Sequence, residues 1–272
     1  MAPDRAAAHR ADLGAALTSL DRLGRERPEL SAPAQTLRRI LTATFDHPVA
    51  AVGPIRHDAA PPFFVQATPR FDHADLHRRA RAVCQVLESE HAAAGRLRLA
   101  LTNREIDLAD YLVHALVTGE PPAVPTAIDA ALLESVAQLV AMPALAPLTT
   151  RVDPPPGSHH VGLACPYCGA PPLLAEARGL EQRRLMRCGR CAASWPMPRL
   201  DCPACAQATL QVFRVEDQDD RYRLLACGGC DARLKLVTTL VPLSPPALLV
   251  ADLASVHLDL IGGPAERPEP PG

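Results

Sequence analysis

The sequence predicts an α+β chain, in which an all-helical N-terminal domain is followed by two tandem metal-binding units and a C-terminal helix. Three observations support this prediction. Leucines at helical spacing alternate with prolines through the N-terminal half, eight of the nine cysteines fall between Cys165 and Cys230, and a Ser-Pro-Pro helix start follows at Ser244. Apolar residues make up 48% of the chain but aromatic residues only 3%, so alanine and leucine must fill most of the core.

The N-terminal domain is expected to contain about five helices. The first carries one leucine stripe, and the later ones begin near capping residues and end at proline or glycine. A proline-rich loop over residues 48–70 separates two of them. The expected segments are residues 4–26, a helix after Ser31 that ends before Pro48, a helix from Asp72, a helix that opens at the capping box Thr102–Glu105 and closes at Gly119, and a helix that opens at Thr126–Asp129 and ends at Pro143 and Pro147.

Composition sets the expected domain boundaries. A Pro/Gly-rich linker with His159 and His160 follows the helical domain, and the last residues are rich in proline and glutamate. The resulting division is residues 1–151 for the helical domain, 161–200 and 201–243 for the two metal-binding units, 244–263 for the C-terminal helix and 264–272 for a disordered tail.

Four Cys-x-x-Cys pairs carry the strongest chemical signal. Two cysteines three residues apart place both sulfurs on one side of a tight turn, which supplies half of a tetrahedral metal site. The N-terminus lacks a signal-peptide core, so we expect a cytosolic protein whose thiols stay reduced and bind metal rather than form disulfides. The predicted metal ligands are Cys165, Cys168, Cys188, Cys191, Cys202, Cys205, Cys227 and Cys230.

The four pairs indicate a duplicated unit. Proline follows Cys165 and Cys202, whereas glycine follows Cys188 and Cys227. Duplication favours sequential pairing, in which each unit closes its own site across a gap of 19 or 21 residues, and the crossed arrangement of RING-type folds is the alternative. The β-prone segments expected to carry the turns are residues 184–186, 210–215, 222–225 and 234–240.

Each predicted site is closed. Four thiolates leave no open position for water or substrate, which argues against hydrolytic metal catalysis. Gly169 permits positive φ directly after Cys168, so backbone N–H groups can turn toward the sulfurs. Four sulfurs suit zinc or a single iron of the rubredoxin kind, and the residues alone favour a structural zinc ribbon.

The remaining features of the sequence mostly exclude functions. The chain has no uncharged apolar run near the ~20 residues of a membrane span, and no phosphate-binding loop or metalloprotease motif. Net charge is −2, and thiolates on divalent ions would offset the excess of three positive charges in residues 161–240, so no basic nucleic-acid footprint results. Cys84 is interpreted as a small core side chain and the two linker histidines as non-ligands. A nucleic-acid-binding zinc-ribbon protein and a small electron-transfer protein are the two alternative functions.

At this point the residues resemble a known family. The stretch Cys165-Pro-Tyr-Cys-Gly-Ala-Pro-Pro172, the stretch Leu185-Met-Arg-Cys-Gly-Arg-Cys-Ala-Ala-Ser-Trp195 and the stretch Arg199-Leu-Asp-Cys-Pro-Ala-Cys205 resemble the motifs of FdhE-type formate dehydrogenase accessory proteins. The segment Ala251–Asp259 resembles the C-terminal helix of that family. The resemblance covers residues 162–261 and stops near Ile261.

The resemblance implies a cytoplasmic accessory factor rather than an enzyme. Such a protein would bind the catalytic subunit of respiratory formate dehydrogenase before export, with no nucleic acid and no membrane insertion. It also implies two rubredoxin-like units, which shifts the expected pair of metal ions from zinc to iron and leaves zinc as the alternative.

Overall fold

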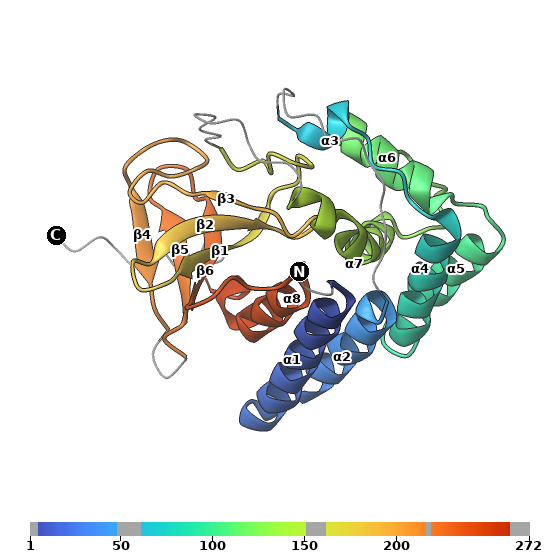
Figure 1. Ribbon diagram of the computed structural model, residues 1–272, viewed down its shortest axis with the longest axis horizontal. Coiled ribbons are helices and arrows are strands. Elements are labelled where there is room, and N and C mark those ends of the chain that lie inside the picture. The colour runs from blue at the N-terminus through green and yellow to red at the C-terminus, as the bar shows by residue number, and fades with distance from the viewer. Residues whose placement is uncertain (1–4, 48–60, 151–161, 216–218, 262–272) are drawn as a thin grey trace.

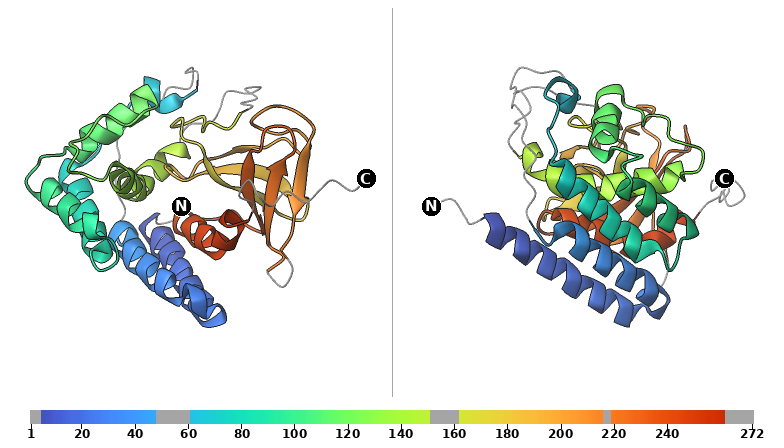
Figure 2. Two further views of the ribbon diagram at one scale, coloured as in Figure 1. Left: turned by 180° about the vertical axis from the view of Figure 1, so that it is seen from behind. Right: turned by 90° about the vertical axis from the view of Figure 1, so that its right-hand side faces the viewer.

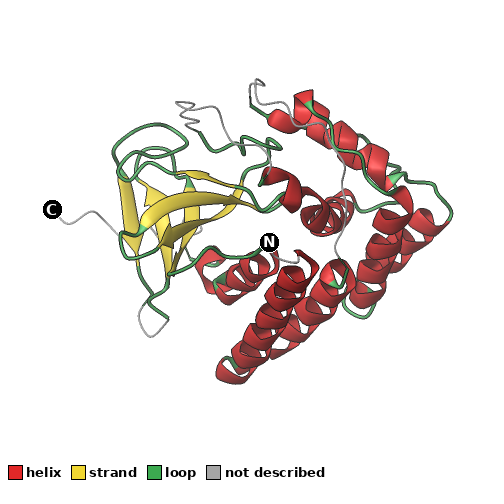
Figure 3. Cartoon of the chain, in the orientation of Figure 1, coloured by secondary structure: helices red, strands yellow, loops and turns green. Residues whose placement is uncertain are grey.

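The computed structural model describes residues 5–47, 61–150, 162–215 and 219–261. It shows the predicted mixed architecture, with helices on one side, a twisted sheet on the other and a C-terminal helix beside the sheet (Figures 1 and 3). The linker over 152–160 with its two histidines, the tail over 264–272 and most of the loop over 48–70 lie outside the described residues. The described helices are α1 (Arg5–Glu26), η1 (Pro28–Leu30), α2 (Ser31–Phe45), α3 (Phe63–Gln66), α4 (His73–Leu87), α5 (Ala92–Thr102), α6 (Leu108–Thr118), α7 (Ala130–Thr149), α8 (Pro245–Ala254) and η2 (Val256–Asp259).

The helices form a layer around α7. The long helices α1 and α2 lie side by side, and α1 also packs along α8 (Figure 2). The largely buried helix α7 contacts α2, α4, α5 and α6. It is long and apolar enough to cross a membrane, but 67% of its most apolar window is buried inside the protein, as expected of a core helix.

The helix start predicted at Asp72 is confirmed by a capping contact, whereas the start predicted at Thr126 lies three residues later, at Asp129. The side-chain carboxylate of Asp72 accepts a hydrogen bond from the Asp75 N–H at 3.0 Å and begins α4. Asp129 begins α7 in the same way, with the Leu132 N–H at 3.0 Å. These bonds satisfy backbone donors that the first helical turn leaves without partners.

The predicted capping box was wrong. Thr102 is the last residue of α5, a helix that the sequence patterns did not reveal, and its hydroxyl donates back to the Arg98 carbonyl. The next helix, α6, begins at Asp107, whose carboxylate accepts bonds from the Ala109 and Asp110 N–H groups. The end of α6 at Gly119, which has a φ of 82°, is as predicted.

Two predicted helix ends also differ from the structure. Pro143 and Pro147 were expected to end the last N-terminal helix, but α7 continues through both to Thr149. Each proline removes one backbone hydrogen bond, and tight packing of the neighbouring side chains offsets that loss. The C-terminal helix was expected to reach Leu260. It ends at Ala254, where the Ser255 N–H is shared between the Ala251 carbonyl at 3.1 Å and the Asp252 carbonyl at 3.3 Å and a short 3₁₀ turn follows.

The described strands form one continuous six-stranded sheet in the order β3-β2-β1-β6-β5-β4. The four β-prone segments are confirmed as strands, whereas β1 and β3 were not predicted from the sequence. The bounds are β1 (Pro172–Arg178), β2 (Arg183–Cys188), β3 (Ser194–Pro196), β4 (Leu210–Phe213), β5 (Tyr222–Cys227) and β6 (Arg233–Thr239).

The two copies of the duplicated unit meet at a parallel seam in this sheet. Strands β1 to β3 pair antiparallel in one copy, as do β4 to β6 in the other. Across the seam Ala175 pairs with Leu236 and Arg178 with Thr239, so β1 and β6 begin and end together. Strand β1 follows the first Cys-x-x-Cys pair of its copy, and β6 follows the last pair of the other copy. Because the two strands run in the same direction and in register, both cysteine clusters lie at the same end of the sheet.

A buried carboxylate holds this seam to the C-terminal helix. Glu176 on β1 is fully buried and accepts hydrogen bonds from Arg178, Arg187, the Thr239 hydroxyl at 2.8 Å and the Leu243 N–H at 3.1 Å. Burial by itself raises the pKa of Glu176, but the Arg178 and Arg187 guanidiniums and the Thr239 hydroxyl outweigh it and hold the pKa below its ordinary value of 4.5. One ionised side chain therefore joins β1, β2, β6 and the connection to α8.

Candidate metal centres

The sulfurs of the eight predicted cysteines gather into two groups of four, in the sequential pairing that duplication predicts. Within each group the ligand atoms lie within 4.8 Å of one another, and all eight cysteines are free thiols. An ion about 2.3 Å from each of four sulfurs requires sulfur–sulfur separations of about 3.8 Å. The closest Sγ–Sγ distances are 3.6 Å for Cys165–Cys191, 3.4 Å for Cys168–Cys188, 3.6 Å for Cys202–Cys230 and 3.6 Å for Cys205–Cys227. Both groups therefore fit a tetrahedral metal ion.

Every Cys-x-x-Cys pair is folded by the same backbone turn. The N–H of its first cysteine donates to the carbonyl five residues later, at 2.8–3.0 Å in all four pairs. The residue after the second cysteine has positive φ in all four. These residues are Gly169 (φ 73°), Ala192 (φ 56°), Ala206 (φ 59°) and Asp231 (φ 57°). The prediction for Gly169 is confirmed, and three non-glycine residues adopt the same left-handed conformation.

The turns direct hydrogen-bond donors at the sulfurs. The Cys188 sulfur accepts bonds from the Arg190 and Cys191 N–H groups at 3.3 and 3.5 Å. In the second cluster the Cys227 sulfur lies 3.3 Å from the Gly229 N–H and 3.1 Å from the Thr209 hydroxyl. The Thr209 hydroxyl and the Gly229 N–H lower the pKa of Cys227 to about 6. Such contacts stabilise thiolate, the form of cysteine that binds a metal ion.

The left-handed residues give a direct test of the turn geometry. Gly169→Ala is expected to lower the free energy of unfolding by about 1–2 kcal/mol, because a left-handed backbone strains a residue with a Cβ. Steric exclusion would add little, since the new Cβ would meet only the Pro62 Cγ at 3.7 Å. Ala206→Gly, the reverse change in the second cluster, is expected to raise stability by up to about 1 kcal/mol. Denaturant unfolding of the metal-loaded protein measures both changes.

A helical glycine supplies the control. Gly14 lies inside α1 with no neighbour within 4 Å of a built Cβ, so Gly14→Ala is expected to stabilise the chain by about 1 kcal/mol. If Gly169→Ala and Gly14→Ala changed stability in the same direction, the strain argument would be wrong.

The two clusters differ in their access to solvent. All four cysteines of the first cluster are at most 1% exposed. In the second cluster Cys202 and Cys227 are buried, Cys205 is half-buried and Cys230 is exposed. The first cluster is thus sealed inside the protein, whereas one side of the second opens to water.

Contacts with the helical layer seal the first cluster. The N–H groups of Phe63 and Phe64, which begin α3, donate to the carbonyls of Pro166 and Tyr167 at 2.9 Å each. These two carbonyls belong to the turn between Cys165 and Cys168. The Phe63 ring also meets the Tyr167 ring edge-on at a centroid distance of 5.3 Å. A short helix that the sequence did not predict therefore covers the first turn.

A partly buried ion pair joins the second turn of the first cluster to α7. The guanidinium of Arg190, between Cys188 and Cys191, lies 3.0 Å from the Glu134 carboxylate on α7. Burial alone raises the pKa of Glu134, but bonds from Gln138 and Tyr111 and the nearby Arg190 charge hold it below its ordinary value. Neither Glu134 nor Thr209 carries a spacing signal in the sequence, and only the folded chain brings Glu134 to Arg190 and Thr209 to the Cys227 sulfur.

The remaining cysteine takes no part in either cluster. Cys84 on α4 is fully buried in the helical core, as its interpretation as a core side chain predicts. Burial and the nearby Glu88 charge raise the pKa of its thiol to about 12, so it stays neutral at physiological pH.

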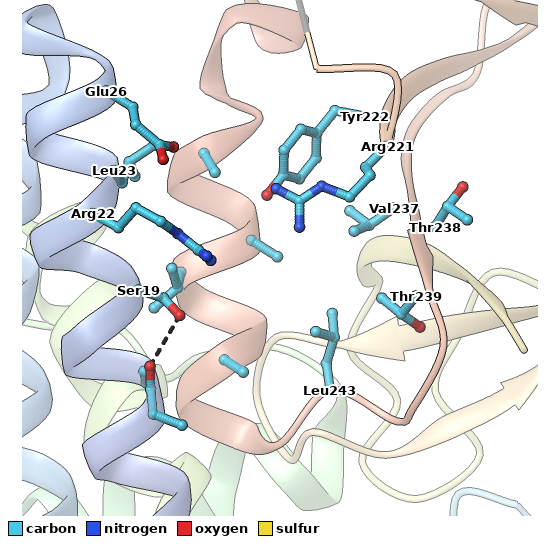
Figure 4. Close-up of a pocket in the computed structure, with 16 residues that line it drawn as sticks. Ser19, Arg22, Leu23, Glu26, Arg221, Tyr222, Val237, Thr238, Thr239 and Leu243 are labelled. Carbon is cyan, nitrogen blue, oxygen red and sulfur yellow. Dashed lines mark hydrogen bonds between the residues drawn. The ribbon is translucent and has the colours of Figure 1, made fainter.

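A cavity of about 180 Å³ lies between α1, α8 and the adjacent ends of β5 and β6 (Figure 4). The labelled side chains of Arg22 and Glu26 from α1 face those of Arg221 and Tyr222 from the sheet. Asp219 already pairs with Arg221 at 2.6 Å, and the cavity wall is otherwise mostly apolar. Because Glu26 and Asp219 balance the charges of Arg22 and Arg221, the cavity carries no net charge that would select a charged ligand.

Comparison with known proteins shows similarity to one group. No family model matches the chain. The chain is 30% identical over 175 residues to an FdhE homolog of Stutzerimonas stutzeri, in a match that covers 62% of this chain and 54% of the relative. It is 29% identical over 99 residues to the FdhE protein of Escherichia coli O127:H6, which covers 35% of this chain and 31% of that protein. The matched segment thus spans about half the length of the first relative or less.

The fold has a counterpart among solved structures. The crystal structure of the FdhE protein from Pseudomonas aeruginosa superposes with a TM-score of 0.62, covering 90% of this chain and 88% of that one. Sequence identity in that superposition is 20%, so this comparison shows a shared fold.

Proposed function

The similarity in sequence and in fold supports the FdhE family for this chain, and on that premise we propose that it is an accessory protein for formate dehydrogenase. It binds the catalytic subunit of that enzyme in the cytoplasm before export and catalyses no reaction itself. The observation that carries the proposal is the pair of four-cysteine clusters on one sheet, in a chain that is 30% identical over 175 residues to one FdhE homolog and 29% identical over 99 residues to an FdhE protein. Four thiolates around an ion leave no position for a substrate, which favours a binding role over turnover.

We further propose that each cluster holds one metal ion. The donor set is four sulfurs in a compact group, and N–H donors face the sulfurs in both clusters. Iron or zinc would neutralise thiolates that the fold cannot otherwise stabilise, since the first cluster is sealed from water. The family resemblance favours iron, which would add the capacity for one-electron chemistry.

Elemental analysis with a visible spectrum tests the metal. Protein produced without affinity-tag metals is expected to contain two ions per chain and to show iron–thiolate absorption. Two zinc ions per chain and no visible absorption would refute the assignment of iron, and the clusters would then be structural zinc sites.

A binding measurement tests the accessory role. The purified, metal-loaded chain is expected to capture the formate dehydrogenase catalytic subunit of the same organism, and to leave an unrelated molybdenum enzyme unbound. Failure to bind that subunit with the metals either oxidised or reduced would refute the proposal.

One observation favours electron transfer as a second candidate function. Cys230 of the second cluster is exposed, and an iron ion there would lie near the protein surface, where a redox partner can approach. Reversible reduction by a physiological reductase would support this function, and zinc in both clusters would exclude it.

A further inference from the structure

Four large apolar side chains stand exposed in three neighbouring turns of the sheet. Leu180, Leu240 and Val241 lie at the end of the sheet opposite the cysteine clusters, because β1 and β6 run in parallel and end together at Arg178 and Thr239. Leu200 lies in the loop after β3, two residues before Cys202 and next to Arg199, whose guanidinium reaches the Glu181 carbonyl in the β1–β2 turn. The Gly179 N–H donates to the Thr239 carbonyl at 2.8 Å, which fixes the β1–β2 turn against the chain that leaves β6. The exposed side chains are Leu180 (94%), Leu200 (74%), Leu240 (75%) and Val241 (70%).

Three arginines without carboxylate partners lie among these apolar side chains. Arg184 donates to the Arg199 carbonyl at 2.9 Å, Arg199 donates to the Glu181 carbonyl at 3.2 Å, and Arg223 donates to the Asp220 carbonyl at 3.2 Å. Over the part of the chain that the structure describes, none of the three forms an ion pair, whereas Arg178, on the neighbouring strand, pairs with Glu176. Within the described residues, no carboxylate is therefore in ion-pair contact with these three guanidiniums.

The sheet register brings two of these arginines to one face. Ala177 pairs with Arg184 on one side and with Thr238 on the other, and Leu236, two residues before Thr238, pairs with Arg223. Side chains two residues apart, or directly paired, share a face, so Arg184 and Arg223 project from the same one. Burial first, and then the nearby Arg199 and Arg223 charges, lower the pKa of Arg184.

The geometry points to a docking surface at this end of the sheet for an acidic, apolar segment of the protein partner. We define the sheet-end surface as Arg184, Arg199 and Arg223 with Leu180, Leu200, Leu240 and Val241. Carboxylates of the partner would pair with the guanidiniums, and its apolar side chains would cover the leucines and the valine. This inference rests on the proposed function, because the partner it names is the formate dehydrogenase catalytic subunit.

An anionic membrane or a nucleic acid fits this surface less well. Glu181 follows Leu180 directly and Asp201 follows Leu200, so acidic and basic groups are interspersed on this surface. A protein segment can place its carboxylates against the arginines and away from Glu181 and Asp201, whereas a uniformly anionic bilayer cannot. Exposed leucines likewise add nothing to contacts with phosphates. A protein segment can place apolar groups against the leucines and acidic groups against the arginines at the same time.

Substitutions on the exposed leucines test the surface without disturbing the core. The double variant Leu180→Asp, Leu240→Asp is expected to weaken binding of the catalytic subunit at least about tenfold, measured by biolayer interferometry on the full, metal-loaded chain. Arg199→Glu is expected to weaken it similarly and to flatten the salt dependence of the wild-type affinity. Leu260→Asp is the matched control, because Leu260 is 81% exposed but follows η2, near the start of β6.

The outcomes separate this inference from the proposed function. If the wild-type chain binds and the double variant binds equally well, the sheet-end surface is wrong and the accessory role stands. If the wild-type chain does not bind the subunit, both fail. Weakening by Leu260→Asp of the same size as in the double variant would also overturn the assignment. So would cosedimentation of the wild-type chain with phosphatidylglycerol vesicles that the double variant loses.

Discussion

Cys188→Ser is expected to leave the chain unfolded at 25 °C, whereas Cys230→Ser is expected to remove one metal ion and keep most of the fold. Cys188 ends β2 inside the core and belongs to the cluster that water cannot reach. Metal binding at structural four-ligand sites contributes about 10–16 kcal/mol, which equals or exceeds the total stability of a typical domain. Cys230 is exposed, so water can replace its sulfur and solvate the thiolates that remain near the surface.

Metal content and circular dichroism measure this difference. We expect two ions per chain for the wild-type protein, one for Cys230→Ser, and an unfolded spectrum for Cys188→Ser. Cys84→Ala is the control, since Cys84 is buried outside both clusters and its loss is expected to cost about 1 kcal/mol while both ions stay bound. Equal loss of structure in Cys188→Ser and Cys230→Ser would show that burial does not decide the role of each cluster.

Glu176→Gln is expected to destabilise the protein by about 3–5 kcal/mol, the usual effect of removing one partner from a buried ion pair. The amide has the shape of the carboxylate but no charge, so Arg187, which is 4% exposed, would keep a buried charge without its counter-ion. The amide nitrogen would also face the guanidinium donors of Arg178 and Arg187. Urea unfolding at pH 7 measures the change, and Glu181→Gln in the exposed turn nearby is the matched control.

The same carboxylate predicts a dependence of stability on pH. The folded-state pKa of Glu176 is lower than its ordinary value of 4.5, so its contribution is fully present above that pH. As pH falls from 4.5 through the folded-state pKa, the folded protein must take up a proton at the cost of the ion pairs, and this contribution is lost. Glu176→Gln should therefore show a weaker loss of stability than the wild-type protein in this range. Parallel curves for the two proteins would contradict the assignment.

The sequence predicts those parts of the fold that depend on interactions between residues close together in the chain. Cysteine spacing predicts the two sulfur groups because a tight turn of four residues determines where both thiols of a pair lie. Asp72 predicts a helix start because a carboxylate satisfies N–H groups only three residues away. These signals depend on near neighbours in the chain.

The parts that could not be predicted depend on contacts between distant residues. Helix α5 begins after His91, which makes no side-chain capping bond, so no capping residue in the sequence indicates where this helix begins. Strand β1 holds Glu176 in the core, and only Arg187 and Thr239, far along the chain, make a buried carboxylate tolerable there. The parallel pairing of β1 with β6 has no signal in either strand alone.

That pairing has a consequence for any attempt to divide the protein. A fragment that stops after residue 200 would keep the first four cysteines but strip β1 of its neighbour, leaving a bare row of amide and carbonyl groups along an apolar strand. Such a fragment is expected to self-associate into insoluble material. The pairing of β1 with β6 thus makes the two cysteine units depend on each other, since separating them would expose an unpaired strand edge in each.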